Sequence, residues 1–535
     1  MQRALQRLSS ETFDVLIVGG GATGCFTARD ASMRGLKVAL VEARDFASAT
    51  SAHNSKLAHG GLRYLRNFEF GLVRESLRER RGLMRIAPHL VRPLPFLLPL
   101  NGARTMERLK LSAGLTLYDL LSYDRNRGIT EHLPGHRWIN RRDTAAREPV
   151  LAGAALEGAF EYYDAQMYAP ERIALENLID ADAHGAAIAN YVCADQLLLK
   201  GGGIEGAMVH DVMTGAVFDI RARTVLVAAG PWADLFLERA TGHKAAHKLI
   251  RSKGIHLLVP QISTAALTIE AGDGHLFALP WRGHTLLATT DTPFTGDPAT
   301  VAVTEADIEG LLAMFRRYLP LAGLTRDKVE FFYAGLRPLV SDGAKDSYNV
   351  SRRSELVDHT SEGMRGVFSA LGGKWTTSRQ LAQTVTDALV KKLGAKAAPC
   401  ATATTPLPGG RFDRFDELTR GFQKAYPGIG SMRSMAHMLG ARLPLALKGA
   451  KMTELVSLNQ SGDTMAQVLL ALREEMALTL EDMVMRRTGI GQFGPASADV
   501  ISKVAGVMAA QLGWNAEKTQ REIKGLNKLY QVAAA

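Results

Sequence analysis

The chain has 535 residues, too many for one hydrophobic core, so we expect two or three domains. Hydrophobic residues make up 46% and charged residues 22%, a balance that excludes a largely disordered chain. The formal net charge of +10 favours anionic partners: a lipid surface, nucleic acid or small anions. No apolar stretch is long enough to predict a membrane span, and no secretory signal is expected in the first residues.

The three cysteines, Cys25, Cys193 and Cys400, are far apart and form no CxxC pair. This spacing predicts neither a disulfide framework nor a zinc site, and it is typical of a protein from a reducing compartment. We therefore expect buried thiols and no metal centre.

The N-terminal segment has the pattern of a dinucleotide-binding βαβ unit. The apolar run at 14–18 predicts a buried parallel strand, and Gly19, Gly21 and Gly24 follow it at GxGxxG spacing. These glycines allow a tight turn, a close approach of backbone to a pyrophosphate, and packing of the helix expected over about 23–34.

The next segment favours FAD over NAD. A second strand over 37–41 ends at Glu42, whose carboxylate can accept hydrogen bonds from an adenosine ribose. The chain then continues at 47–65 as a loop of small hydroxyl residues and Gly-Gly, without another helix. Such a loop lets backbone pass close to an extended ligand, and FAD is one because its flavin continues beyond the pyrophosphate.

Two distant segments are expected to return to the same sheet. Residues 223–232 predict a strand that runs into a Gly-Pro turn, and 367–371 predict another strand. Gly372-Gly373-Lys374 then opens a helix to about residue 393. The free N–H groups at that helix start could stabilise a reduced, anionic flavin.

Together these segments resemble the FAD-dependent, quinone-linked glycerol-3-phosphate dehydrogenases. The matching motifs span nearly the whole chain: GGGATG at 19–24, SKLAHGGLRYL at 55–65, AAGPWAD at 228–234, IHLLVP at 255–260, LPW at 279–281, ATTDTPFTGDP at 288–298, AGLRPL at 334–339, LGGKWTTSR at 371–379 and a C-terminal segment at 480–488. The chain departs from the family at His53-Asn54, where two serines are common, and at 340–350.

The resemblance implies oxidation of the C2 hydroxyl of sn-glycerol 3-phosphate to dihydroxyacetone phosphate, with hydride transfer to FAD and electron delivery to membrane quinone. It implies an α/β fold: a Rossmann-like FAD-binding domain, an antiparallel-sheet substrate domain and a C-terminal helical domain. The expected ranges are 12–405 for the FAD-dependent region (FAD-binding parts at about 12–65, 150–235 and 350–400, substrate domain at about 66–149 and 236–349) and 406–535 for the helical domain.

The same resemblance assigns the site residues. Those expected to hold FAD are Gly19, Gly21, Ala22, Thr23, Gly24, Glu42, Ala43, Thr50, Ser51, Lys56, Leu57, His59, Gly60, Gly61, Val192, Gly230, Gly373, Lys374 and Thr376. Those expected at the reacting substrate are His59, Arg63, His256, Arg337, Arg352 and Lys374.

Chemistry supports this second set. The planar fork of arginine suits a phosphate clamp, and Arg337 aligns more securely than Arg352. Histidine suits the base that takes the hydroxyl proton, with His59 preferred to His256. A nearby cation could instead lower the pKa of the substrate hydroxyl, so a dedicated base is not required.

Two basic amphipathic segments could lie in a lipid interface. One is the helical stripe Arg74, Arg78, Arg81 and Arg85, and the other is 106–121. The alternative is that each packs its apolar face on the core. With a quinone acceptor, we expect a peripheral, monotopic protein on the cytoplasmic face of the inner membrane, and the sequence leaves a homodimer open.

Two other functions remain open from the sequence. One is an FAD-dependent oxidase that uses oxygen, of the glycerophosphate or amino-acid type. The other is a non-catalytic flavin-binding interaction protein. The cationic residues Arg63, Arg337 and Lys374 favour a phosphorylated substrate. No nucleic-acid module is recognisable, so no nucleic-acid partner is expected.

Overall fold

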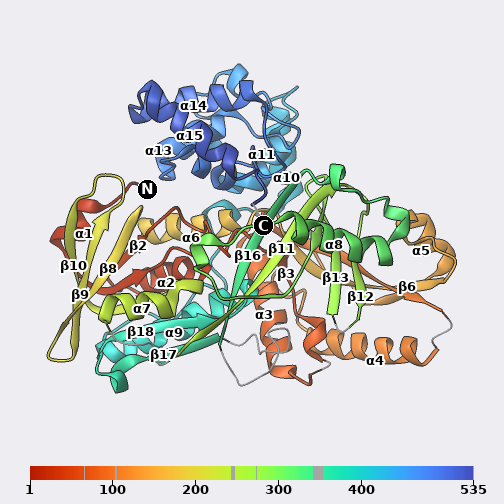
Figure 1. Cartoon of the computed structure of the whole chain (residues 1–535), viewed down its shortest axis with the longest axis horizontal. Helices are drawn as coiled ribbons and strands as arrows, with labels where there is room; N and C mark the ends of the chain where they lie inside the picture. The colour runs from red at the N-terminus through yellow and green to blue at the C-terminus, as the bar shows by residue number, and fades with distance from the viewer. Residues whose placement is uncertain (66, 103–104, 243–246, 273, 341–353, 534–535) are drawn as a thin grey trace.

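The computed structural model describes residues 1–65, 67–102, 105–242, 247–272, 274–340 and 354–533. Two β-sheets lie side by side with helices packed on them, and a further group of helices lies above both in the view of Figure 1. This arrangement confirms the expected fold class: a dinucleotide-binding sheet, a largely antiparallel sheet and a C-terminal helical domain.

The first sheet contains the predicted dinucleotide-binding unit. Its main path runs β17-β18-β10-β1-β2-β7, in which the strands from β18 to β7 are parallel neighbours. An antiparallel hairpin, β8 and β9, extends the sheet from β10. The bounds are β1 (Thr12–Val18), β2 (Val38–Glu42), β7 (Ala187–Asn190), β8 (Val192–Lys200), β9 (Gly203–Asp211), β10 (Val217–Val227), β17 (Ser354–Asp358) and β18 (Val367–Gly372).

Both faces of this sheet are covered. Val15 and Ile17 pack in the core formed with α2, α6 and α9, whereas Leu16 and Val18 pack with the β8–β9 hairpin and α7. Burial on both faces explains why this strand is continuously apolar. The helices are α1 (Leu5–Ser10), α2 (Ala22–Met33), α6 (Pro170–Ala183), α7 (Ala233–Thr241) and α9 (Ser378–Leu393).

The second sheet runs β15-β11-β14-β13-β12-β4-β6-β3, with β16 on β11 and β5 on β6. All its pairings are antiparallel except β4 with β12. Its strands are β3 (Leu57–Ala58), β4 (Val91–Asn101), β5 (Arg137–Asn140), β6 (Leu156–Met167), β11 (Leu249–Pro260), β12 (Ala266–Ala271), β13 (Gly274–Trp281), β14 (His284–Ala288), β15 (Thr292–Phe294) and β16 (Phe331–Val340). β6 belongs to this second sheet, although its residues fall within a range that was expected to bind FAD (about 150–235). The domain ranges stay a prediction.

Helices flank this second sheet and form the C-terminal group. Beside the sheet lie α3 (Phe70–Ile86), α4 (Thr105–Leu121), α5 (Arg141–Arg147) and α8 (Glu305–Tyr318). The C-terminal helices are α10 (Phe415–Ala425), α11 (Met432–Leu439), α12 (Leu443–Leu447), α13 (Met465–Glu474), α14 (Ala498–Leu512) and α15 (Ala516–Lys528). Among the described helices, none has both the length and the apolar character needed to cross a bilayer.

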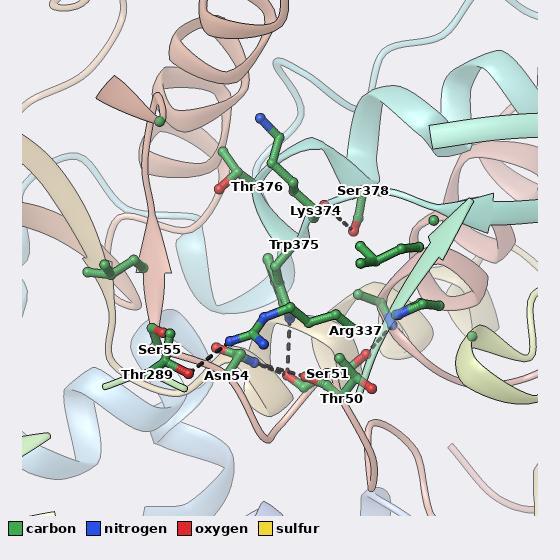
Figure 2. Close-up of a pocket in the computed structure, with 18 of the residues that line it drawn as sticks. Thr50, Ser51, Asn54, Ser55, Thr289, Arg337, Lys374, Trp375, Thr376 and Ser378 are labelled. Carbon is green, nitrogen blue, oxygen red and sulfur yellow. Dashed lines mark hydrogen bonds between the residues drawn. The ribbon is translucent and has the colours of Figure 1, made fainter. Parts of the chain in front are cut away.

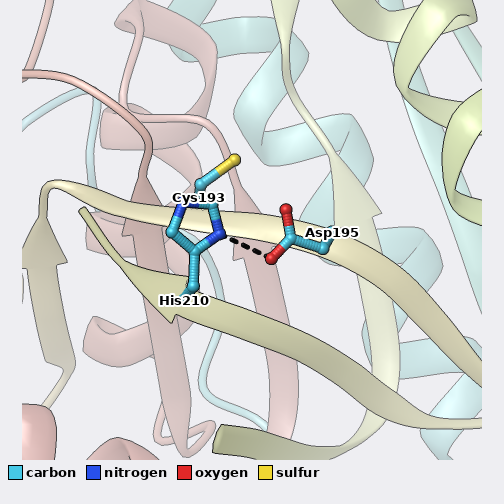
Figure 3. Close-up of side chains that lie close together, drawn as sticks. All are labelled: Cys193, Asp195 and His210. Carbon is cyan, nitrogen blue, oxygen red and sulfur yellow. Dashed lines mark hydrogen bonds and ion pairs between the residues drawn. The ribbon is translucent and has the colours of Figure 1, made fainter. Parts of the chain in front are cut away.

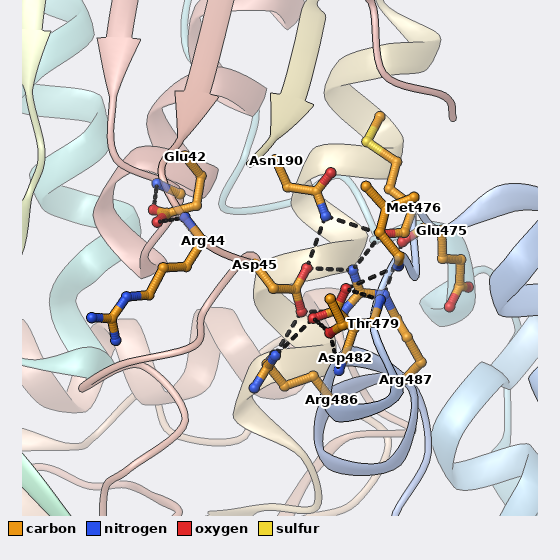
Figure 4. Close-up of polar contacts among 12 residues, drawn as sticks. Glu42, Arg44, Asp45, Asn190, Glu475, Met476, Thr479, Asp482, Arg486 and Arg487 are labelled. Atoms are coloured by element: carbon orange, nitrogen blue, oxygen red, sulfur yellow. Dashed lines mark hydrogen bonds and ion pairs between the residues drawn. The ribbon is translucent and has the colours of Figure 1, made fainter. Parts of the chain in front are cut away.

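Buried ion pairs join the C-terminal group to the loop that follows β2 (Figure 4). The carboxylate of Asp45 accepts hydrogen bonds from Arg486 Nε at 2.6 Å and from Arg487 Nη2 at 2.7 Å. Asn190, at the end of β7, also donates to it at 3.1 Å. Burial alone would raise the pKa of Asp45, but Arg487 and Arg486 outweigh burial and lower this pKa to about 2. Asp45 is therefore a buried anion with two counter-charges.

Replacing Asp45 by Asn would leave two buried guanidinium groups without their shared counter-charge. We expect a loss of about 3–5 kcal/mol in the free energy of unfolding, measured as a lower midpoint in urea. The matched control is Asp499→Asn, because Asp499 is 72% exposed and pairs with Lys503 on the surface. This control should change stability by less than about 1 kcal/mol. Equal midpoints for the two variants would contradict the anchoring role of Asp45.

Candidate active site

The turn between β1 and α2 has no room for side chains. Gly19 has φ +114°, and a Cβ on it would lie 2.6 Å from the carbonyl oxygen of Ala228. A Cβ on Gly24 would lie 1.9 Å from the carbonyl oxygen of Gly19. The two glycines therefore let β1, α2 and the end of β10 meet by backbone alone, as the GxGxxG spacing predicts.

Polar groups fix the cavity side of this turn. Glu42, at the end of β2, accepts hydrogen bonds from the backbone N–H of Gly20 at 2.6 Å and of Arg44 at 2.9 Å. Burial raises the pKa of Glu42, while these two N–H groups oppose the rise. Ser51 Oγ accepts a hydrogen bond from the N–H of Ala22 at 2.9 Å. The start of α2 is thus tied to the loop expected to surround FAD.

A cavity of about 1960 Å³ extends from this turn between the two sheets to α4. It exceeds the roughly 300–1,000 Å³ of an ordinary small-molecule pocket, so an extended dinucleotide and a substrate can share it. The expected FAD residues that line it are Gly19, Gly21, Ala22, Thr23, Glu42, Ala43, Thr50, Ser51, Leu57, His59, Gly61, Val192, Gly230, Gly373, Lys374 and Thr376.

Three expected FAD residues lie behind the cavity wall. Gly24 packs against the turn, as described above. The buried amine of Lys56 donates to the carbonyl oxygen of Ala52 at 2.5 Å and lies 3.7 Å from a carboxylate oxygen of Glu171. A Cβ on Gly60 would lie 2.3 Å from the hydroxyl of a buried tyrosine. These residues support the FAD loop from behind and do not face the ligand space.

His59, Arg63 and Lys374 gather on one side of the cavity. The Lys374 amine lies 4.5 Å and the Arg63 guanidinium 5.0 Å from the ring centre of Tyr64. Burial, together with the Lys374 and Arg63 charges, lowers the pKa of His59 to about 4, and Asp164 opposes this shift. His59 is therefore neutral at pH 7, the state in which an imidazole can accept a proton.

Arg337 occupies a different part of the same cavity (Figure 2). Its Nη2 donates to Thr289 Oγ1 at 2.8 Å, and its Nη1 donates to Ser252 Oγ at 3.2 Å. Asp291 Oδ2 lies 3.8 Å from Nη1. In Figure 2 the Lys374 amine lies well apart from Arg337. The three expected cations within the described residues, Arg63, Arg337 and Lys374, thus form two groups and not one clamp.

The structure separates the two histidine candidates. His256 is buried and does not line the cavity: its Nε2 lies 3.0 Å from Ser55 Oγ, and its ring stacks on Tyr333 at 4.8 Å. Burial and the nearby Arg337 charge lower the pKa of His256 well below its usual range. His59 is therefore better placed to touch a substrate. Arg352 lies outside the described residues.

Sequence reasoning missed part of the cavity wall. Trp375 lines it and donates from its indole nitrogen to the carbonyl oxygen of Ser51 at 3.1 Å. Thr289, which orients Arg337, lies in the family-like segment 288–298 but received no role. Apolar wall residues come from the second sheet: Phe96, Leu98, Tyr162 and Phe277. No local motif marks these four, because pairing of distant strands brings them together.

Three features define the class of protein: the glycine turn, Glu42 at the end of β2, and the long cavity beside the second sheet. Together they are typical of a flavin-dependent oxidoreductase. Residues 14–379 match the FAD dependent oxidoreductase family, and residues 400–519 match the C-terminal domain of alpha-glycerophosphate oxidase.

Similar proteins narrow this class. A glycerol-3-phosphate dehydrogenase of Synechocystis is 33% identical over 98% of this chain and 97% of its own length. The aerobic glycerol-3-phosphate dehydrogenase of Staphylococcus aureus is 30% identical over 97% of this chain and 96% of its own. The structure of a Bacillus halodurans glycerol-3-phosphate dehydrogenase complexed with FAD superposes with a TM-score of 0.78 at 28% identity, covering 98% of this chain and 96% of that one. The chain belongs to the FAD-dependent glycerol-3-phosphate dehydrogenase family, and its cofactor is FAD.

Replacing Gly21 by Val should prevent retention of FAD. A Cβ there would lie 3.2 Å from Ser51 Oγ, at a position that lines the cavity, so a branched side chain would enter the space expected for the pyrophosphate. The measurement is the flavin absorbance of purified protein. Gly82→Ala is the control, since a Cβ on Gly82 of α3 meets nothing within 4 Å and should leave FAD content unchanged. Normal flavin content in Gly21→Val would refute the assignment.

Proposed function

We propose that this enzyme oxidises the C2 hydroxyl of sn-glycerol 3-phosphate to dihydroxyacetone phosphate and delivers the electrons to membrane quinone. FAD, when bound, supplies the two-electron acceptor. The observation that carries the proposal is Arg337, a guanidinium held toward the cofactor cavity by Thr289 and Ser252. The names of the full-length relatives support the same substrate.

The residues of the chain would divide the work as follows. Arg337 binds the substrate phosphate, because its fork can donate two parallel hydrogen bonds to phosphate oxygens. His59 takes the hydroxyl proton, because burial, together with the nearby Lys374 and Arg63 charges, keeps its imidazole neutral. Lys374 and Arg63 place positive charge where the substrate oxygen becomes negative. The apolar cavity wall formed by Phe96, Leu98, Tyr162 and Phe277 of the second sheet excludes water from the part of the cavity that it lines.

Replacing Arg337 by Lys keeps the charge but removes the bidentate fork. We expect kcat/KM for sn-glycerol 3-phosphate to fall roughly ten- to a hundredfold, the equivalent of about 1.5–3 kcal/mol for a charged hydrogen bond. Arg337→Ala should lose more activity. Both variants should keep bound FAD, because the glycine turn and Glu42 are unchanged. Steady-state kinetics and flavin absorbance measure the two effects.

Unphosphorylated glycerol is the control for this prediction. It lacks the group that Arg337 would bind, so its weak turnover should hardly change in either variant. Equal losses for glycerol and glycerol 3-phosphate would show that Arg337 acts on the fold or the chemistry, and would remove it as the phosphate clamp.

For membrane contact we propose α4, which lies at the edge of the molecule away from α13–α15 (Figure 1). Large apolar side chains are exposed on and beside it: Phe68 (77%), Met106 (64%), Leu109 (65%), Leu120 (65%) and Tyr123 (78%). Exposed Arg108 and Lys110 on the same helix suit anionic headgroups.

The basic stripe on α3 is less suited to this role, because Arg74 and Arg81 both pair with Asp124 of the same chain. Lys110 and Met106 of α4 also line the cofactor cavity, so lipid bound at α4 would lie beside the route to the flavin. We propose a peripheral protein on the cytoplasmic face of the inner membrane.

Changing both Leu109 and Leu120 to Glu should weaken binding to anionic vesicles by tenfold or more, since each charge would replace an apolar group in the lipid interface. Quinone reduction in vesicles should fall in parallel, while reduction of a soluble dye persists. The matched control is the double variant Met452→Glu and Val456→Glu. These two side chains are 56% and 59% exposed, and neither lines the cofactor cavity. Equal vesicle binding by both double variants would exclude α4.

The electron acceptor is tested separately. Turnover that consumes oxygen and does not reduce quinone would favour the oxidase alternative.

A further inference from the structure

A thiol, an imidazole and a carboxylate meet on the β8–β9 hairpin (Figure 3). Cys193 on β8 and His210 on β9 are directly paired across the hairpin. The strand register shifts between Ala194 and Gln196, so Asp195 has no paired residue opposite it. Its Oδ2 lies 2.6 Å from His210 Nδ1.

The irregularity in β8 is what brings the third group into place. A bulge re-aims a side chain locally, and here it directs the Asp195 carboxylate to the imidazole. Arg239 of α7 fixes the backbone at this point by donating from Nη2 to the carbonyl oxygen of Ala194 at 2.9 Å. One potential ligand atom from each of Cys193, Asp195 and His210 lies within 4.8 Å of the other two.

We propose that Cys193, Asp195 and His210 bind one divalent cation of the zinc class. Sulfur, imidazole nitrogen and carboxylate oxygen are the donors that zinc takes in proteins, with a water in the fourth position. Bonds of about 2.0–2.3 Å would place the donor atoms roughly 3–4 Å apart, so the side chains need to close by about an ångström. The His210 and Asp195 side chains are 36% and 31% exposed, which leaves the cation a path from solvent.

The spacing of the cysteines gave no indication of this cluster, because its three donors do not form a local sequence pattern. The cluster uses one cysteine, and the histidine lies 15 residues beyond Asp195 in the sequence. Only the pairing of β8 with β9 brings the donors together. Cys193 also lines the cofactor cavity, so a bound cation would brace the hairpin at the cavity wall.

The test uses FAD-loaded protein, freed of metal with a chelator and kept reduced. Zinc chloride is titrated by calorimetry, and cobalt(II) is titrated by its visible d–d bands beyond the flavin absorption. We expect one equivalent of either cation to bind. Cys193→Ser, His210→Gln and Asp195→Asn should each weaken the affinity at least tenfold. Cys400→Ser is the matched control, because Cys400 is also a half-buried thiol and contacts Thr402 instead.

A second measurement on the unaltered chain guards against variants that fold poorly. Zinc should slow alkylation of Cys193 but not of Cys400, with each thiol followed by mass spectrometry. Absence of zinc binding by the unaltered protein would overturn the proposal. So would equal affinities in Cys193→Ser and Cys400→Ser, or equal protection of the two thiols.

Discussion

The close backbone approach at Gly19 and Gly24 is the constraint on which the cofactor cavity depends. Any side chain at either position would collide with a main-chain carbonyl oxygen, that of Ala228 or of Gly19 itself. Because the contact is made by backbone, the start of α2 lies against the ends of β1 and β10, and its first residues, Ala22 and Thr23, line the cavity. Glu42 and Ser51 then fix that turn from the neighbouring strand and loop.

A second constraint acts on the same loop from the opposite end of the chain. Asp45 lies three residues beyond Glu42, and its two counter-charges, Arg486 and Arg487, come from the C-terminal helical group. Breaking this cluster is costly because Arg487 would lose the carboxylate that it pairs with in the interior, whereas Arg486 also pairs with Asp482 and Glu481. The C-terminal group thus helps to hold the loop that lines the cofactor cavity, which gives it a role in the site without contributing a residue to the cavity wall described above.

Features that depend on neighbouring residues could be predicted from the sequence, whereas contacts between residues far apart in the chain could not. The βαβ unit was predictable because its strand periodicity and its glycine spacing are local properties. The facing of His59 was not predictable, since it depends on the pairing of β3 with β6 and on a hydrogen bond from its N–H to Thr376 Oγ1. The burial of His256 was not predictable either, since it depends on how the FAD loop packs against β11. Two groups that no spacing rule could join are Asp45 with Arg487, 442 residues apart, and Arg337 with Thr289, 48 residues apart.

The proposed function requires that sn-glycerol 3-phosphate reduce the flavin held in this cavity. The most direct measurement is the anaerobic addition of sn-glycerol 3-phosphate to the oxidised, FAD-loaded protein while the flavin absorbance is followed. We expect the oxidised-flavin bands to bleach with about one equivalent of substrate and glycerol at the same concentration to leave them nearly unchanged. If the oxidised bands persist with glycerol 3-phosphate while dithionite still bleaches them, sn-glycerol 3-phosphate is not the substrate that reduces this flavin.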